Sequence, residues 1–171
     1  MGNYELALKS FGWMPPDVTK NRAYGRTKPG FGINADQQIN DQVGVFARLG
    51  WNDGQNETWC FTEADEALSA GIQISGNNWH RKNDVLAIAT VVNGLSDNHK
   101  NYLMRGGSGF QLGDGSLNYG YETAAEIYYS YKPDKLRNIW LTADYQFILN
   151  PGYNKDRGPV NAFSVRMHIE L

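Results

Sequence analysis

The sequence lacks the features that mark several common classes of protein. Its single cysteine, Cys60, excludes an internal disulfide and a zinc site built from cysteines. A formal net charge of -2 provides no basic field, so we expect no nucleic-acid partner. The three histidines show no repeated ligand spacing, and no acid–base pair or nucleophile motif is apparent. We therefore expect no enzymatic activity, no metal and no cofactor.

Long apolar segments are also missing. The longest apolar run covers eight residues, 85–92, and includes Thr90, whereas a membrane-spanning helix needs about 20 residues. The first residues contain no basic segment followed by an apolar stretch, so no export signal is visible. Because the features described next favour an outer-membrane protein, we interpret the chain as the C-terminal part of a longer protein.

The end of the chain has strict alternation instead. In the segment from Val160 to Leu171, apolar residues at odd positions from 163 to 171 alternate with small, polar or charged residues at even positions from 162 to 170. Side chains of a β-strand point to opposite faces in turn, so this segment has one apolar face and one polar face. Its length is close to the 9–11 residues of a tilted membrane-spanning strand. The pattern favours an outer-membrane barrel over a soluble sandwich.

Similar alternation, together with the apolar run 85–92, predicts eight strands, at about 3–9, 28–39, 42–52, 67–76, 84–93, 118–131, 136–149 and 160–171. Short connections (40–41, 77–83, 132–135) alternate with long ones (10–27, 53–66, 94–117, 150–159). Outer-membrane barrels have this organisation, with short periplasmic turns and long outer loops. Within the longest connection, 97–104 is expected to form a short helix capped by Ser96 and ended by Gly106 and Gly107. The predicted fold is an all-β, antiparallel, up-and-down transmembrane β-barrel segment spanning 1–171.

Several motifs in the connections and strands resemble one family. They are 31–38 (FGINADQQ), 44–54 (GVFARLGWNDG), 92–96 (VNGLS), 113–120 (GDGSLNYG) and 150–160 (NPGYNKDRGPV). Together they resemble the carbohydrate-selective porins of the OprB type. The resemblance runs from about Gly2 to the end, and it implies a sixteen-stranded sugar-permeable barrel of which this chain is roughly the C-terminal half. It also implies a location in the outer membrane of a Gram-negative bacterium.

If the apolar rows face lipid, the opposite rows face the lumen. A sugar-selective channel needs hydrogen-bonding carboxylate, amide and guanidinium groups beside an aromatic surface, because sugars present both hydroxyl groups and apolar C–H faces. The candidate sugar-binding residues are Arg48, Glu126, Trp140, Asp144 and Arg166. Glu126, Asp144 and Arg166 lie on three consecutive predicted strands and mix both signs of charge, which favours neutral polar solutes. An equally simple interpretation is that they only hydrate the wall and bridge neighbouring strands.

Other architectures remain open at this stage. The apolar rows would also suit the core of a soluble all-β carbohydrate-binding module. Eight strands in lipid must close into a small barrel, pair with the missing N-terminal half, or form a homo-oligomer, because unpaired backbone groups are costly there. A closed eight-stranded barrel has an interior filled by side chains and would conduct little. The expected partners are sugars and outer-membrane lipid.

Overall fold

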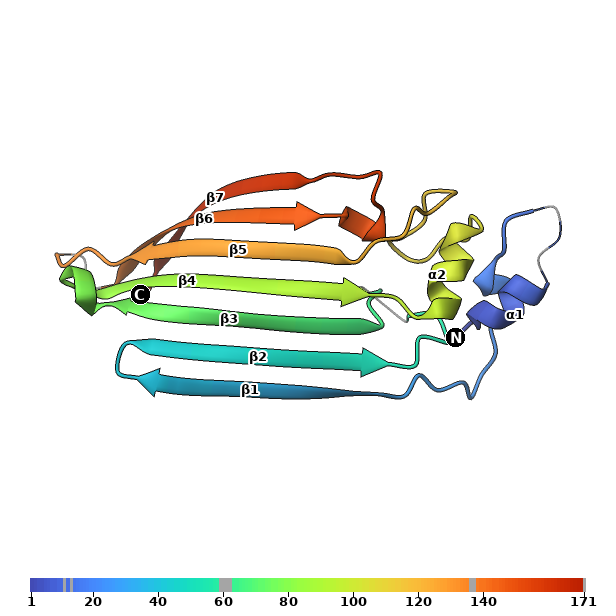
Figure 1. Cartoon of the computed structure of the whole chain (residues 1–171), viewed down its shortest axis with the longest axis horizontal. Coiled ribbons are helices and arrows are strands. Elements are labelled where there is room, and N and C mark those ends of the chain that lie inside the picture. The colour runs from blue at the N-terminus through green and yellow to red at the C-terminus, as the bar shows by residue number, and fades with distance from the viewer. Residues whose placement is uncertain (11, 13, 59–62, 136–137, 171) are drawn as a thin grey trace.

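The computed structural model describes residues 1–10, 12, 14–58, 63–135 and 138–170. Its main element is one antiparallel sheet of seven strands in the order β1-β2-β3-β4-β5-β6-β7. The strands are β1 (Gly30–Asn40), β2 (Val43–Asn52), β3 (Glu66–Gly76), β4 (Arg81–Gly94), β5 (Glu122–Tyr131), β6 (Ile139–Leu149) and β7 (Val160–Ile169). Each strand pairs with its neighbours in the sequence, so the topology is up-and-down (Figure 1). Cys60 and Leu171 lie outside the described residues.

The strands alternate between short and long connections, as the sequence predicts. Tight turns join β1 to β2 and, through the 3-10 turn η2 (Asn77–Trp79), β3 to β4. The long connections gather at the other end of the sheet (Figure 1). They hold α2 (Asp97–Met104) and the 3-10 turn η3 (Pro151–Tyr153). The side chain of Ser96 accepts a hydrogen bond from the amide of His99, which confirms the predicted cap of α2.

The predicted first strand, 3–9, is wrong. The chain forms α1 (Tyr4–Lys9) there, and the 3-10 turn η1 (Val18–Asn21) follows. The side chain of Asn3 accepts from the amide of Leu6 and begins the helix. Tyr4 and Ala7, three residues apart on one helical face, are buried, while Leu6 is 45% exposed. Tyr4 therefore does not belong to the row of apolar residues that we expected to face lipid.

The N-terminal segment and the long connections form a compact unit at their end of the sheet, which we call the loop cluster (1–10, 12, 14–29, 53–58, 63–65, 95–121 and 150–159). Its core is made of buried apolar side chains from the N-terminal segment, 95–121 and 150–159: Tyr4, Ala7, Val18, Leu95, Tyr102, Leu103, Leu117 and Tyr153. No helix in the described part of the chain is long and apolar enough to cross a membrane.

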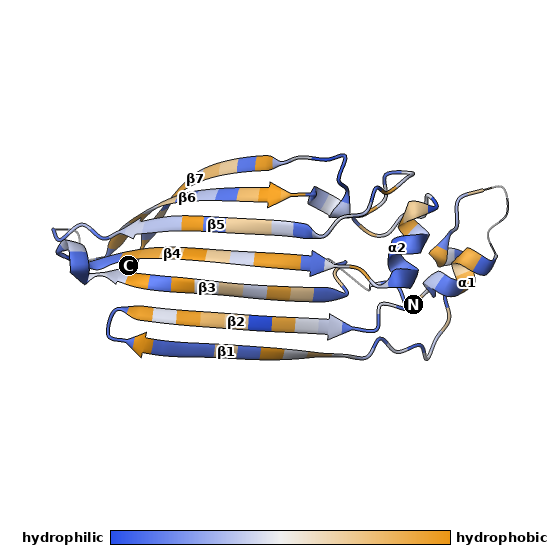
Figure 2. Cartoon of the chain, in the orientation of Figure 1, coloured by the Kyte–Doolittle hydropathy of each residue, from blue (hydrophilic) through white to orange (hydrophobic). Residues whose placement is uncertain are grey.

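The sheet has two different faces. The outer face carries the odd-numbered residues of β7, of which Phe163, Val165 and Met167 are 80%, 81% and 65% exposed. No second sheet covers them among the described residues. The structure therefore does not support a soluble sandwich of two sheets. Nor do β1 and β7 pair with each other within the described ranges, and the small closed barrel is therefore also wrong. Figure 2 shows that β1 is mainly hydrophilic and β4 mainly hydrophobic.

Candidate functional site: the inner face of the sheet

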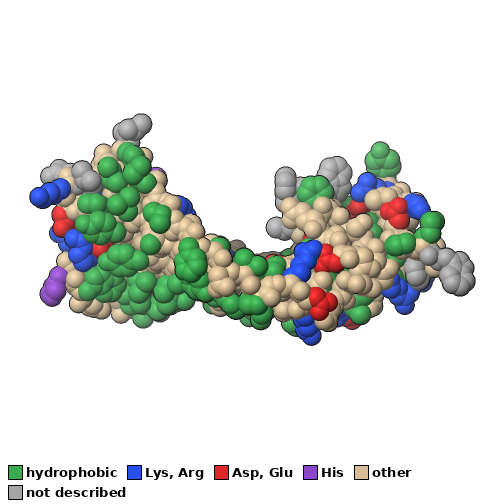
Figure 3. Space-filling view, turned by 90° about the horizontal axis from the view of Figure 1, so that it is seen from above, with side chains coloured by type: hydrophobic (Ala, Val, Ile, Leu, Met, Phe, Trp, Pro, Cys, Tyr) green, Lys and Arg blue, Asp and Glu red, His purple; other side chains and the backbone are tan. Residues whose placement is uncertain are grey.

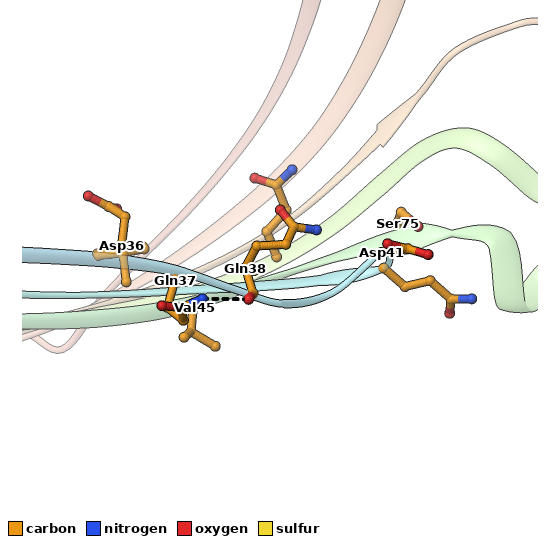
Figure 4. A pocket seen from close by; sticks show the side chains of 10 residues that line it. Asp36, Gln37, Gln38, Asp41, Val45 and Ser75 are labelled. Carbon is orange, nitrogen blue, oxygen red and sulfur yellow. Dashed lines mark hydrogen bonds between the residues drawn. The ribbon is translucent and has the colours of Figure 1, made fainter.

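The inner face is the side of the sheet that carries Arg48, Glu126, Trp140, Asp144 and Arg166. In space-filling view the molecule is hollowed between two raised ends, one of which is the loop cluster (Figure 3). The far strands curve toward the side on which Asp36 and Gln38 lie, while Val45 lies on the opposite side of the sheet (Figure 4). The inner face is thus concave, and the outer face is convex.

The register aligns the inner-face residues in rows that cross the whole sheet. One row reads Asp36, Phe46, Gly71, Ala89, Glu126, Gln146, Ala162. The next row toward the short turns reads Gln38, Gly44, Gln73, Ala87, Tyr128, Asp144, Ser164. Alanine occupies the β4 position of both rows (Ala89 and Ala87), and Gly71 stands beside Ala89 on β3. Polar and aromatic side chains therefore form two groups, one on β1–β3 and one on β5–β7.

The group on β5–β7 holds four of the five candidate residues. Asp144 is buried, with 8% of its surface exposed, and Oγ of Ser164 donates a hydrogen bond to its Oδ1 (3.3 Å). A guanidinium nitrogen of Arg166 lies 3.9 Å from Oδ2 of Asp144. Glu126, on the neighbouring strand, interacts with Asp144 and Gln146. The structure thus brings two carboxyl groups and one guanidinium group together, with the mixed charge that the sequence predicts.

Trp140 lies at the short-turn end of the same group. Its ring packs edge-on against His168 with centroids 5.3 Å apart, and Nζ of Lys132 lies 4.1 Å from its centroid. Trp140 and Arg166 line one side of a cavity of about 530 Å³, and Gln73 lines the other side. Tyr128, Ser130 and Thr142 add hydroxyl groups to this cavity. An indole face and several hydrogen-bonding groups therefore meet in one space large enough for a sugar ring.

Arg48 does not join this group. It lies on β2, opposite Asn34 and Ser69, and its guanidinium carbon is 5.1 Å from the centroid of the Phe46 ring. Residue parity correctly places Arg48 on the inner face. Its separation from the group on β5–β7 follows from the strand order, because β3 and β4 lie between them.

Sequence reasoning did not select Phe46, Ser130 or Ser164 as functional residues. Phe46 is an aromatic residue in a polar row, and that exception to the alternation is the signal that identifies it. The two serines follow from the register alone, because each faces a residue of the β5–β7 group.

The outer face has aromatic residues near both ends of the strands. At the loop end, Phe31 and Trp51 pack with ring centroids 5.6 Å apart, beside an apolar groove that Tyr121 also lines. At the short-turn end, Nε1 of Trp79 donates to the hydroxyl of Tyr129 (3.0 Å), which in turn donates to the buried carboxylate of Asp84 (2.6 Å). Outer-membrane barrels carry aromatic girdles at both interfaces. Trp59 lies outside the described residues.

The sheet thus has a polar concave face and an apolar convex face, and comparison with known proteins identifies the family. The model of the carbohydrate-selective porin family, OprB, matches residues 2–171. The chain belongs to the OprB family. No curated protein matches the chain.

Among solved structures, the chain is similar to OprB of Pseudomonas putida in its high-pH structure. The TM-score is 0.62 at 18% sequence identity, and the match covers 82% of this chain and 34% of the other. The likeness supports the fold of an OprB barrel segment. The chain spans about a third of the length of the porin that it matches.

Proposed function

We propose that this OprB-family chain forms part of the wall of a channel that lets neutral sugars cross the outer membrane of a Gram-negative bacterium by passive diffusion. The observation that carries the proposal is the difference between the faces. The outer face presents uncovered apolar residues such as Phe163, Val165 and Met167. The inner face presents Glu126, Asp144, Arg166 and Trp140 around and beside one cavity.

The proposed partners are sugars on the inner face and lipid on the outer face. A buried carboxylate balanced by a guanidinium group creates no strong field of one sign, which suits neutral solutes better than ions. The indole of Trp140 offers an apolar surface to the C–H face of a sugar ring, and the neighbouring hydroxyl groups offer hydrogen bonds. We propose no chemical change of the solute.

The open sheet needs a partner at each side. In the described residues β1 pairs only with β2, and β7 pairs only with β6. Each unsatisfied backbone group in lipid costs several kcal/mol, so strands of membrane barrels pair on both sides. We propose that residues 1–171 are one barrel segment, and that either a further N-terminal part of the same protein or another copy of the chain completes the wall.

The proposal is tested by solute flux. The protein is folded into liposomes, and swelling is measured in isotonic glucose, in a neutral disaccharide and in a charged solute of similar size. We expect glucose to enter faster than in protein-free liposomes. Replacing Arg166 with alanine leaves the Asp144 carboxylate unbalanced, so cation permeation should rise relative to glucose entry. The control is Val165→Ala, on the adjacent outward position.

Two results would contradict the proposal. One is swelling no faster than that of empty liposomes for all three solutes. The other is recovery of the protein as a monodisperse soluble monomer without detergent, because the outer face would then not require lipid.

A further inference from the structure

A second inner-face cavity lies on β1–β3, near the short turns, away from Trp140. Its volume is about 440 Å³. Figure 4 shows the side chains of Asp36 and Gln38 rising from β1 on this side of the sheet. The other lining residues are Gly44, Phe46, Gln73 and Ser75 on the inner face, Asp41 and Gln42 of the turn, and Gln37 and Val45, which have the outward parity. The cavity therefore combines carboxylate, amide and hydroxyl groups with one aromatic ring.

Phe46 forms an apolar platform in the cavity because its neighbour has no side chain. Gly71 lies directly opposite it on β3, and a Cβ atom there would approach Cε1 of the ring to 2.4 Å. The missing side chain lets the ring lie across the sheet instead of standing away from it. Arg48 contacts the ring from the side of the neighbouring row. An aromatic residue at this polar position has no evident role in packing the sheet against another layer.

Two polar side chains beside the ring are exposed and face the cavity. The residue directly opposite Phe46 on β1 is Asp36, an exposed carboxylate. Gln73, one row nearer the short turns, is also exposed and faces Gly44, so its amide has open space on the β2 side. Both side chains are therefore free to form hydrogen bonds with a solute.

We propose that this cavity is a saccharide subsite on the channel wall, separate from the one beside Trp140. The inference rests on the proposed function, because it requires the inner face to line the sugar path. The C–H face of a pyranose ring packs on Phe46. Its hydroxyl groups bond to Asp36 and Gln73. Gln73 lines both cavities, so a sugar passes from one subsite to the other along the wall.

The subsite is tested by direct binding, with glucose as the probe. Saturation-transfer difference NMR is recorded on the intact protein folded in detergent, over a range of glucose concentrations. Phe46→Ala should weaken binding at this subsite by about fivefold, the loss expected for one aromatic stacking contact. Gln73→Leu keeps the side-chain size but removes the amide, and it should weaken binding to both cavities.

Two matched variants control the measurement. Phe163→Ala removes the same kind of ring from the outer face, and it should leave the glucose signal unchanged. Trp140→Ala should reduce the signal from the other cavity while the Phe46-dependent part remains. Circular dichroism of every variant verifies the strand content. A well-folded Phe46→Ala protein that binds glucose as the parent does would overturn the subsite.

The outcomes separate this inference from the proposed function. Glucose flux into liposomes with no effect of Phe46→Ala on binding leaves the channel intact and rejects the subsite. Phe46-dependent glucose binding without any flux supports the subsite and rejects the channel. The loss of both rejects the assignment of the inner face to sugars.

Discussion

The sheet and the loop cluster use apolar side chains in opposite ways. The loop cluster encloses its apolar residues: Tyr4, Tyr102 and Leu103 are at most 1% exposed. The sheet leaves its apolar residues uncovered, and Val165 is 81% exposed. A water-soluble unit hides such groups in its own core, whereas a membrane-spanning strand exposes them to lipid. The comparison indicates that the loop cluster suits water and that the outer face of the sheet suits lipid.

The two regions also treat buried charge differently. In the loop cluster, Nδ1 of His99 donates to Asp65 (2.8 Å), because a carboxylate only accepts. Nε2 of the same ring bonds to the hydroxyl of Tyr4 (3.1 Å), and Nζ of Lys28 pairs with Asp65 (3.0 Å). On the inner face of the sheet, one cation among the described residues lies within 4.0 Å of Asp144, namely Arg166 at 3.9 Å. The charged groups of the loop cluster bond to one another, whereas the side chain of Arg166 is exposed and can also contact a solute.

The largest expected effect comes from emptying the core of the loop cluster. Tyr102→Ala removes a ring that contacts Tyr4, and it removes a hydroxyl that accepts from the amide of Val18 and donates to the carbonyl of Ser108. We expect a loss of about 3–5 kcal/mol from the stability of the loop cluster, as for other buried aromatic truncations. Limited proteolysis of the loops, with circular dichroism of the strands, measures it.

The control for this change is Tyr24→Ala. Tyr24 lies in the same region but is fully exposed, so its removal should leave the cleavage rate unchanged. Equal protection of both variants would show that the loop cluster does not depend on its own core. Simultaneous loss of the strand signal would show that the two regions do not fold separately.

A slightly smaller effect is expected on the outer face. Val165→Arg places a charge on the convex side of β7, opposite Ala143. In lipid this costs about 2–4 kcal/mol near the middle of the membrane and less near the interfaces. Folding into lipid vesicles under increasing urea measures the change. Ser164→Arg is the matched control, since the adjacent residue faces inward near Asp144 and should cost much less. Equal costs for both variants would contradict the assignment of the faces.

Much of the sheet is predictable from the sequence, because alternation has a direct structural cause. The seven strands of the structure correspond to the last seven predicted strands, and the faces of β2, β5, β6 and β7 follow from residue parity. The orientation of β4 is not predictable, because 85–92 is apolar at both parities. The structure directs Leu86 and Ile88 outward and the smaller Ala87 and Ala89 inward, beside the polar rows.

The error at 3–9 shows the limit of short patterns. Tyr4, Leu6 and Leu8 alternate like a strand, but Tyr4 and Ala7 are also three apart, as on a helix. Six residues are too few to distinguish the period of a strand from that of a helix. Packing against α2 favours the helix. The network of Tyr4, Asp65 and His99 has no local signal, because its members come from three connections of the loop cluster. Glu126, Asp144 and Arg166 are predictable as neighbours because consecutive strands pair.

Acid should weaken the loop cluster through Asp65. Burial alone would raise the pKa of Asp65, but the hydrogen bond and charge of His99, the amide of Ser96 and the charge of Lys28 lower it to about 2. Because this pKa is below the unfolded value of 3.8, the stabilisation is complete above pH 3.8 and is lost as the pH falls toward 2. It is on the order of 2 kcal/mol.

A pH titration of loop proteolysis measures this effect. Asp65→Asn should destabilise the loop cluster at neutral pH and flatten its dependence between about pH 4 and pH 2. Asp41→Asn, in the exposed turn between β1 and β2, should keep the parent's dependence. A parent protein whose loops are equally protected across this pH range would contradict the role of Asp65.

The smallest effect should come from the cap of α2. Oγ of Ser96 accepts from the amide of His99 and donates to the carbonyl of Gly54 (2.7 Å), while the amide of Ser96 donates to Asp65. Ser96→Ala removes both side-chain bonds but keeps the amide contact, so we expect a loss of about 1 kcal/mol. Ser116→Ala, at an exposed position of the same connection, is the control for loop proteolysis. A Ser96→Ala effect as large as that of Tyr102→Ala would mean that the cap, and not the apolar core, holds the loop cluster together.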